Sequence, residues 1–167
     1  MRNTPIKIVP RTGIAEFDFA EVKTNSETGQ RSLVSTKSFQ PGEVITHFSW
    51  EAVHLNPMIF TVQIADQKHI DLIPEELQCM NHNCNPNCLL DTEGKKLICL
   101  KTIQPGEELN FFYPSTEWDM SNVFSCNCGS ENCLKTIRGA KYLSEPQMKQ
   151  YQFTGFIREK IKLQSNQ

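Results

Sequence analysis

The chain has 167 residues, which is enough for one domain with a sizeable core and too few for a second large unit. With 38% hydrophobic and 22% charged residues, the composition is that of a globular protein and excludes long disordered tracts. A net charge of -2 gives no global positive field, which argues against direct, sequence-independent binding to nucleic acid.

The sequence also argues against a membrane or secreted protein. No apolar stretch reaches the roughly 18 residues of a membrane span, and residues 1–5 lack the apolar core of a secretory signal. All seven cysteines lie between Cys79 and Cys133, and such clustering favours metal binding over disulfides. We therefore expect an intracellular protein, cytoplasmic or nuclear, with no membrane partner.

The first two thirds of the chain are predicted to form mainly strands. Short β-branched or aromatic runs are bounded by Gly, Pro, Asn and Asp, and several alternate apolar and polar residues with a period of two. The expected strands are 14–22, 32–37, 44–48, 59–64 and 96–102.

One segment is echoed later in the chain. Residues 36–44, which contain Gln-Pro-Gly-Glu, resemble residues 100–109, which contain the same four residues. Each Pro-Gly pair predicts a type II turn between two strands, since Pro presets the first central position and Gly tolerates a positive φ at the second. Two ordinary turns of similar composition remain an alternative.

The C-terminal part of the chain is predicted to be more helical. From residue 145 to residue 163, the spacing of apolar residues fits one or two short amphipathic helices, with Gly155 as a weak point. We expect this tail to pack on the core or to cover a site.

A cysteine motif, Cys126-x-Cys128-x4-Cys133, brings three thiolate ligands into eight residues. A structural zinc site uses four ligands, so a further sulfur or imidazole must come from elsewhere, and Cys84 is the best candidate. The alternative is that these are reduced cysteines packed as small hydrophobic residues.

A second cluster of polar residues lies at 81–87, and by itself it indicates only a structured polar loop. His82 alone is more often a hydrogen-bonded structural histidine than a ligand or base.

Three motifs together resemble the SET-domain family, in the family's order and with roughly its spacing. They are Asn81-His82-x-Cys84-x-Pro86-Asn87, Gly106-Glu107-Glu108-Leu109-x-Phe111-x-Tyr113 and Cys126-x-Cys128-x4-Cys133. The resemblance covers roughly residues 14–143.

The resemblance implies a mainly β fold with short helices. It is the SET-domain β-clip with a pseudoknot, in which the segment around Tyr113 threads through a loop near Asn87. A small zinc-stabilised post-SET segment and a C-terminal helix follow. The implied divisions are a SET domain at 14–121, a post-SET zinc segment at 122–143 and a helical tail at 144–167.

The resemblance also implies a methyltransferase that uses S-adenosylmethionine and carries Zn²⁺. The expected acceptor is the side-chain amine of a lysine in a protein substrate. Two alternatives stay open: transfer to a small-molecule nucleophile, and a SET-like binding module that has lost catalysis.

Site residues are carried over position by position. Tyr113 falls on the catalytic tyrosine, and Cys84 falls on the fourth zinc ligand beside Cys126, Cys128 and Cys133. The residues expected to bind the methyl donor are Asn81, His82, Arg31, Ser32, Tyr113, Phe124 and Leu134.

The sequence departs from the family's pattern at several positions. Gln30 and Ser32 replace paired glycines that allow close approach of the backbone to the donor. Gln78 stands where arginine is common, and Phe112 replaces an acidic residue before the tyrosine. Phe112 is expected either to line a drier substrate channel or to pack in the core.

The proposed chemistry needs a neutral amine. Neutralising a lysine at pH 7 costs about 4 to 5 kcal/mol, and burial beside a sulfonium lowers that cost. Phe111, Phe112 and Tyr113 are expected to supply apolar walls. Tyr113 is expected to position the methyl group through weak C–H···O contacts, with a core tyrosine as the alternative.

Overall fold

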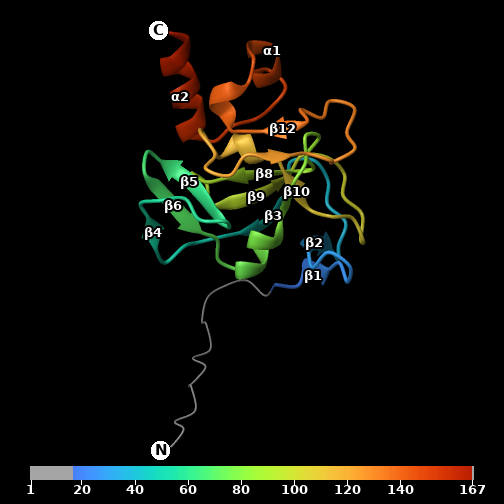
Figure 1. Ribbon diagram of the computed structural model, residues 1–167. Helices are drawn as coiled ribbons and strands as arrows, with labels where there is room; N and C mark the ends of the chain where they lie inside the picture. The colour runs from blue at the N-terminus through green and yellow to red at the C-terminus, as the bar shows by residue number, and fades with distance from the viewer. Residues whose placement is uncertain (1–16, 167) are drawn as a thin grey trace, which may run out of the picture.

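The computed structural model describes residues 17–166 (Figure 1). The expected start of the first strand and of the SET domain, residues 14–16, lies outside the described residues, as does residue 167. No helix in the described part of the chain is long and apolar enough to cross a membrane.

Strands dominate the chain up to residue 111. They are β1 (Ala20–Thr24), β2 (Arg31–Ser35), β3 (Val44–His47), β4 (Val53–His54), β5 (Thr61–Ala65), β6 (Lys68–Asp71), β7 (Asn81–His82), β8 (Cys88–Asp91), β9 (Lys96–Cys99) and β10 (Asn110–Phe111). Beyond them lie β11 (Phe124–Ser125), β12 (Thr136–Ile137), α1 (Glu145–Met148) and α2 (Gly155–Ser165). Three short 3₁₀ helices are η1 (Glu75–Cys79), η2 (Tyr113–Ser115) and η3 (Ala140–Tyr142).

The strands form several small sheets. The largest has five strands in the order β3-β9-β8-β10-β7, and a three-stranded sheet has the order β4-β6-β5. Two hairpins, β1-β2 and β11-β12, complete the set. The prediction of a mainly β fold with short helices and a C-terminal helix is confirmed.

Both Pro-Gly pairs form the predicted type II turns, and the two turn segments contact each other. Gly42 and Gly106 each have a φ of 90°, and the amide after each glycine donates to the carbonyl of the glutamine three residues earlier, at 3.1 Å. Phe39 and Ile103 exchange both backbone hydrogen bonds between the segments, at 3.0 and 2.9 Å. The sequence echo therefore corresponds to two similar units that pair with each other.

Strand β10 lies between β7 and β8, although β7 and β8 are consecutive in the chain. It pairs parallel to both, with Phe111 opposite His82 on one side and Cys88 on the other. Asn87 holds the crossing, since its side-chain amide donates to the Glu108 carbonyl at 2.9 Å and its Oδ1 accepts from the Asn110 amide at 2.9 Å. This is the crossing that the pseudoknot requires, and it places Tyr113 beside His82.

The main hydrophobic core lies among the sheets and includes Leu33, Ile70, Leu90, Leu97 and Ile103, all nearly inaccessible to solvent. A second core, formed by Phe112, Ala140, Phe153 and Ile157, packs the C-terminal tail onto the body of the protein.

The tail, expected to form one or two helices, forms two, α1 and α2. Ser144 precedes α1 and exchanges capping contacts with Gln147. Gly155, expected as a weak point, is the first residue of α2. Figure 1 places α1 and α2 at one end of the molecule and the β1-β2 hairpin at the opposite end.

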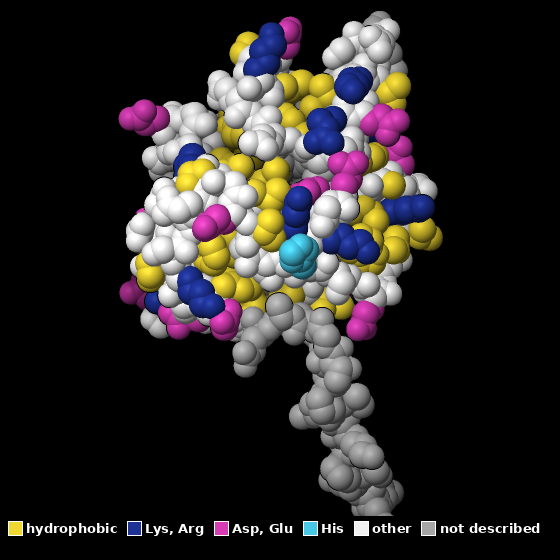
Figure 2. All heavy atoms as spheres, turned by 180° about the vertical axis from the view of Figure 1, so that it is seen from behind, with side chains coloured by type: hydrophobic (Ala, Val, Ile, Leu, Met, Phe, Trp, Pro, Cys, Tyr) yellow, Lys and Arg dark blue, Asp and Glu magenta, His cyan; other side chains and the backbone are white. Residues whose placement is uncertain are grey.

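Figure 2 shows the face opposite to that of Figure 1, on which basic and acidic side chains are interspersed and neither sign dominates. Hydrophobic side chains fill the hollow between the two projections at the top, where the C-terminal helices lie.

Candidate functional site

Four cysteines from two distant segments come together. The Sγ atoms of Cys84, Cys126, Cys128 and Cys133 all lie within 4.8 Å of one another, and those of Cys84 and Cys126 are 3.9 Å apart. Four thiolates about 2.3 Å from a zinc ion form a tetrahedron with edges of about 3.8 Å. The donor set and its spacing therefore fit a structural zinc ion.

Local structure accounts for this arrangement. The β11-β12 hairpin joins the two ends of the cysteine motif, where the Cys126 amide donates to the Lys135 carbonyl at 2.7 Å. Gly129, with a φ of 75°, lets the chain turn back between the ligands. Cys84 arrives from the loop after β7 and accepts a hydrogen bond from the Leu134 amide at 3.4 Å.

The four thiols are not electrostatically equivalent. Burial tends to raise the pKa of Cys128, but hydrogen bonds, led by that with Ser130, outweigh this effect and lower the pKa to about 6. For Cys126, burial dominates and raises the pKa to about 11. At least one thiolate is thus favoured near neutral pH, as metal capture requires.

His82 joins the cysteine cluster to Tyr113. Its Nε2 lies 3.3 Å from the Cys84 Sγ, and its Nδ1 accepts a hydrogen bond from the Tyr113 amide at 3.2 Å. Burial lowers the pKa of His82 to about 4, so the ring is neutral at physiological pH. A neutral ring protonated on Nε2 satisfies both contacts.

Tyr113 is held by hydrogen bonding and by aromatic packing. Its hydroxyl donates to the Met80 carbonyl at 3.0 Å, and its ring packs edge-on against His82 and Phe124, with centroid distances of 5.3 and 6.0 Å. Burial, with a smaller contribution from the charge of Glu108, raises the pKa of Tyr113 to about 12. The phenol therefore stays protonated at neutral pH and does not act there as a base.

A cavity of about 640 Å³ lies beside Tyr113, within the usual size range of small-molecule sites. Of the residues predicted to bind the donor, Arg31, Asn81, Tyr113 and Phe124 line it. The remaining three, Ser32, His82 and Leu134, are not among its lining residues. His82 and Leu134 instead contact the cysteine cluster.

Two of the four departures from the family's pattern, Gln30 and Gln78, line this cavity. Gln30 lines the cavity, and the adjacent Gly29, with a φ of 71°, supplies a backbone position free of side chain at the same wall. Gln78 also lines it, and its amide donates to the Leu72 carbonyl at 3.0 Å.

Phe112 belongs to the second core and not to the cavity beside Tyr113. It is 2% exposed and stacks on Tyr151 with a centroid distance of 3.7 Å and an interplanar angle of 7°. Of the two alternatives considered for Phe112, core packing is the one found. Phe111 and Tyr113 do line the cavity, as expected.

Sequence reasoning missed one charged residue of the cavity wall, Glu117. Its Oε1 accepts a hydrogen bond from the Gln63 amide at 2.8 Å. Burial raises the pKa of Glu117 to about 7, although the hydrogen bond from Gln63 opposes the shift. No sequence signal pointed to Glu117, because its burial depends on what the folded chain packs around the segment after Tyr113.

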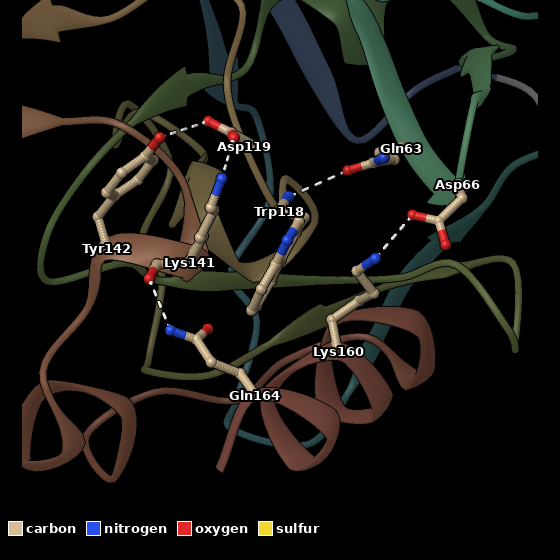
Figure 3. A network of polar contacts seen from close by, with 8 residues as sticks. All are labelled: Gln63, Asp66, Trp118, Asp119, Lys141, Tyr142, Lys160 and Gln164. Atoms are coloured by element: carbon tan, nitrogen blue, oxygen red, sulfur yellow. Dashed lines mark hydrogen bonds and ion pairs between the residues drawn. The ribbon is translucent and has the colours of Figure 1, made fainter. Parts of the chain in front are cut away.

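The residues after Glu117 are fixed by contacts with two elements, β5 and η3 (Figure 3). The Trp118 amide donates to the Gln63 Oε1 at 3.0 Å. Asp119 accepts from the Lys141 ammonium at 2.8 Å and from the Tyr142 hydroxyl at 3.0 Å. These contacts tie the cavity wall to β5 and to η3.

Comparison with known proteins identifies the family. The profile of the SET domain matches residues 30–114, just over half of the chain, so this protein belongs to the SET-domain family.

Similar proteins include methyltransferases of fungi and plants. The chain is 35% identical over 101 residues to Methyltransferase flvH of Aspergillus flavus, which covers 59% of this chain and 56% of that protein. It is 29% identical over 134 residues to Histone-lysine N-methyltransferase set9 of Schizosaccharomyces pombe, covering 71% and 29%, respectively. A match to Histone-lysine N-methyltransferase ASHR3 of Arabidopsis thaliana has 38% identity over 60 residues, covering 32% of this chain and 12% of that protein. The chain thus spans about half the length of flvH and less than a third of set9.

Proposed function

We propose that this chain is an S-adenosylmethionine-dependent N-methyltransferase that methylates the side-chain amine of a lysine in a protein. The observation that carries the proposal is the cavity in which Arg31, Asn81, Phe124 and Tyr113 meet, next to a cysteine cluster that fits zinc. Membership of the SET-domain family and the names of its relatives support the same reaction class.

The polar wall of the cavity suits a zwitterionic donor. The Asn81 amide group donates to the Arg31 carbonyl at 2.9 Å and to the Glu108 Oε1 at 2.7 Å, which fixes its orientation. Its Oδ1 is then left to accept a hydrogen bond from the donor's ammonium group. The Arg31 guanidinium lies over the Phe60 ring, 5.4 Å from its centroid, at the same cavity, where it can pair with a carboxylate.

S-adenosylmethionine, when bound, supplies an electrophilic methyl group. Tyr113, with its hydroxyl fixed by the Met80 carbonyl, can orient that methyl through C–H···O contacts worth about 0.5 to 1 kcal/mol each. The contribution of Tyr113 is therefore alignment of the reacting groups, since its raised pKa rules out proton abstraction at neutral pH.

Zinc is proposed to hold the C-terminal segment against the site. Cys84, Cys126, Cys128 and Cys133 would bind it, joining the loop after β7 to the β11-β12 hairpin. Phe124, which begins β11, lies in the cavity wall, so the same hairpin that carries three ligands also shapes the proposed donor site.

Calorimetric titration of the zinc-loaded protein with S-adenosylmethionine tests donor binding. Intact-mass analysis then separates acceptor classes, with lysine peptides in one arm and a metabolite extract in the other. Mass gains of one methyl on peptides are expected. Gains confined to the extract would assign the enzyme to small molecules, and binding without transfer to either would indicate an inactive binding module.

A further inference from the structure

Glu117 is a carboxyl group in the wall of the proposed active site that forms no ion pair within residues 17–166. It lines the same cavity as Tyr113, four residues later in the chain. Its one side-chain hydrogen bond within residues 17–166 comes from the Gln63 amide to Oε1, which leaves Oε2 available to a ligand.

The backbone around Glu117 is fixed from both sides. Its amide donates to the Tyr113 carbonyl at 3.1 Å, and its carbonyl accepts from the Ala140 amide at 2.8 Å. The bond between Trp118 and Gln63 anchors the next residue (Figure 3). The carboxyl group is therefore preorganised and does not need to be ordered when a ligand binds.

Packing alone gives no reason for a charge at this position. The Gln63 amide needs only an acceptor, which a glutamine side chain would also supply. A carboxyl group, in contrast, is penalised by burial, as the upward shift of its pKa shows. Partly buried charges without a partner are rare in proteins, and they are typical of sites that bind an oppositely charged group.

The other charged and titratable groups near Glu117 are already accounted for. Arg31 is the other formally charged side chain of the described cavity wall, and it lies over Phe60. β5 carries no titratable side chain. Other groups from adjacent elements include the cavity-lining thiol of Cys79, the protonated phenol of Tyr113, and the ion pairs Lys141–Asp119 and Lys160–Asp66. His69 of β6 lies opposite Gln63, and burial lowers its pKa, while Glu108 accepts a hydrogen bond from the Asn81 side chain.

We propose that Glu117 binds the cationic nitrogen of the acceptor and takes its proton, so that the substrate class is a primary or secondary alkylammonium group. The inference rests on the proposed function and deepens it. It applies to the lysine side chain of a protein and to a free alkylamine alike, because both present the same charged nitrogen.

The reaction proceeds in two steps, proton transfer and then methyl transfer. First, an N–H bond of the ammonium breaks and the proton moves to the Glu117 carboxylate, which leaves a lone pair on nitrogen. Second, that lone pair attacks the methyl carbon of the sulfonium donor, the carbon–sulfur bond breaks, and its electron pair stays on sulfur. Glu117 then returns the proton to water.

Calorimetry with simple probes tests the inference on the zinc-loaded full chain. The protein is first titrated with S-adenosylhomocysteine, which reports the proposed donor site. The saturated complex is then titrated with n-butylammonium, and separately with neutral 1-butanol, in two buffers of different ionisation enthalpy. The variants are Glu117→Gln, Glu117→Asp and, as a matched control, Glu159→Gln on the exposed face of α2.

Binding of butylammonium by the wild type, with 1-butanol much weaker, is the expected result. Loss of a charge-assisted contact in Glu117→Gln should weaken butylammonium binding by roughly tenfold or more. Glu117→Asp should retain part of the affinity, and Glu159→Gln all of it. The two buffers should reveal release of a proton on amine binding near pH 7, which is absent in Glu117→Gln, because a bound cation favours ionised Glu117.

Different outcomes separate the inference from the proposed function. Equal butylammonium affinity in Glu117→Gln, or no amine binding by a wild type that binds S-adenosylhomocysteine, would overturn the inference alone. Lost affinity for S-adenosylhomocysteine in Glu117→Gln would also overturn it, by assigning the carboxylate to the donor. If the wild type does not bind S-adenosylhomocysteine, both the inference and the proposed function fail.

Discussion

Replacing Glu117 by glutamine should stabilise the protein at high pH. The pKa of Glu117 is raised from 4.5 to about 7 in the folded protein, so the folded state disfavours the ionised form. Well below pH 4.5 the carboxyl is protonated in both the folded and the unfolded states, so it makes no pH-dependent contribution to the free energy of unfolding. As the pH rises from 4.5 to about 7, the unfolded state ionises first and the folded state loses stability.

The magnitude follows from the size of the shift. A shift from 4.5 to about 7 corresponds to about 3 kcal/mol of lost unfolding free energy once the pH exceeds 7. At pH 5 the loss is only about 1 kcal/mol. Glu117→Gln keeps an oxygen to accept the Gln63 amide and cannot ionise, so it should escape this penalty.

Urea unfolding of wild type and Glu117→Gln at several pH values between 5 and 8.5, with zinc in excess, measures the difference directly. The difference in free energy of unfolding between Glu117→Gln and the wild type should grow in favour of the variant by about 2 kcal/mol from pH 5 to pH 8.5. Comparing the two proteins at each pH cancels changes in metal affinity that both share. A difference that stays constant with pH, or that favours the wild type more strongly at pH 8.5, would refute the assignment of a raised pKa.

Three further substitutions, and Gly106→Ala as a control for the third, test the site and its frame. Tyr113→Phe should lower kcat by roughly tenfold or more while donor affinity in calorimetry changes little, and an unchanged kcat would remove the hydroxyl from the mechanism. Cys128→Ser should lose zinc and donor affinity together, which metal analysis and calorimetry check, and a full zinc content would contradict the assigned ligand set. Gly139→Ala should cost about 1 to 3 kcal/mol or more, because Gly139 has a φ of 118° and an added Cβ would lie 2.5 Å from the Trp118 carbonyl oxygen. In thermal unfolding, Gly106→Ala should lower the Tm less, because an added Cβ there meets open space.

The sequence by itself determined those features that depend on neighbouring residues. The Pro-Gly pairs specify their turns locally, and both turns have the positive φ at Gly42 and Gly106 that a type II turn requires. The cysteine motif likewise encodes three ligands within one short segment, so a metal site could be predicted from spacing. Strands β6 and β8 were not predicted, although β3 and β9, which are equally short, were, so length alone does not explain the difference. In β6 the segment Lys68–Asp71 holds one apolar residue, Ile70, which is too little for a period of two to be recognised.

Only the tertiary structure decided how distant segments share the site. Phe112 follows Phe111 directly, yet Phe111 faces the cavity and Phe112 stacks on Tyr151 in a different core. Glu117 gives no local signal, because its raised pKa comes from burial in the folded protein, and the hydrogen bond from Gln63 in β5 opposes that shift. Burial and the electrostatic effects that follow from it depend on what the rest of the chain places around a residue, and no local pattern records this.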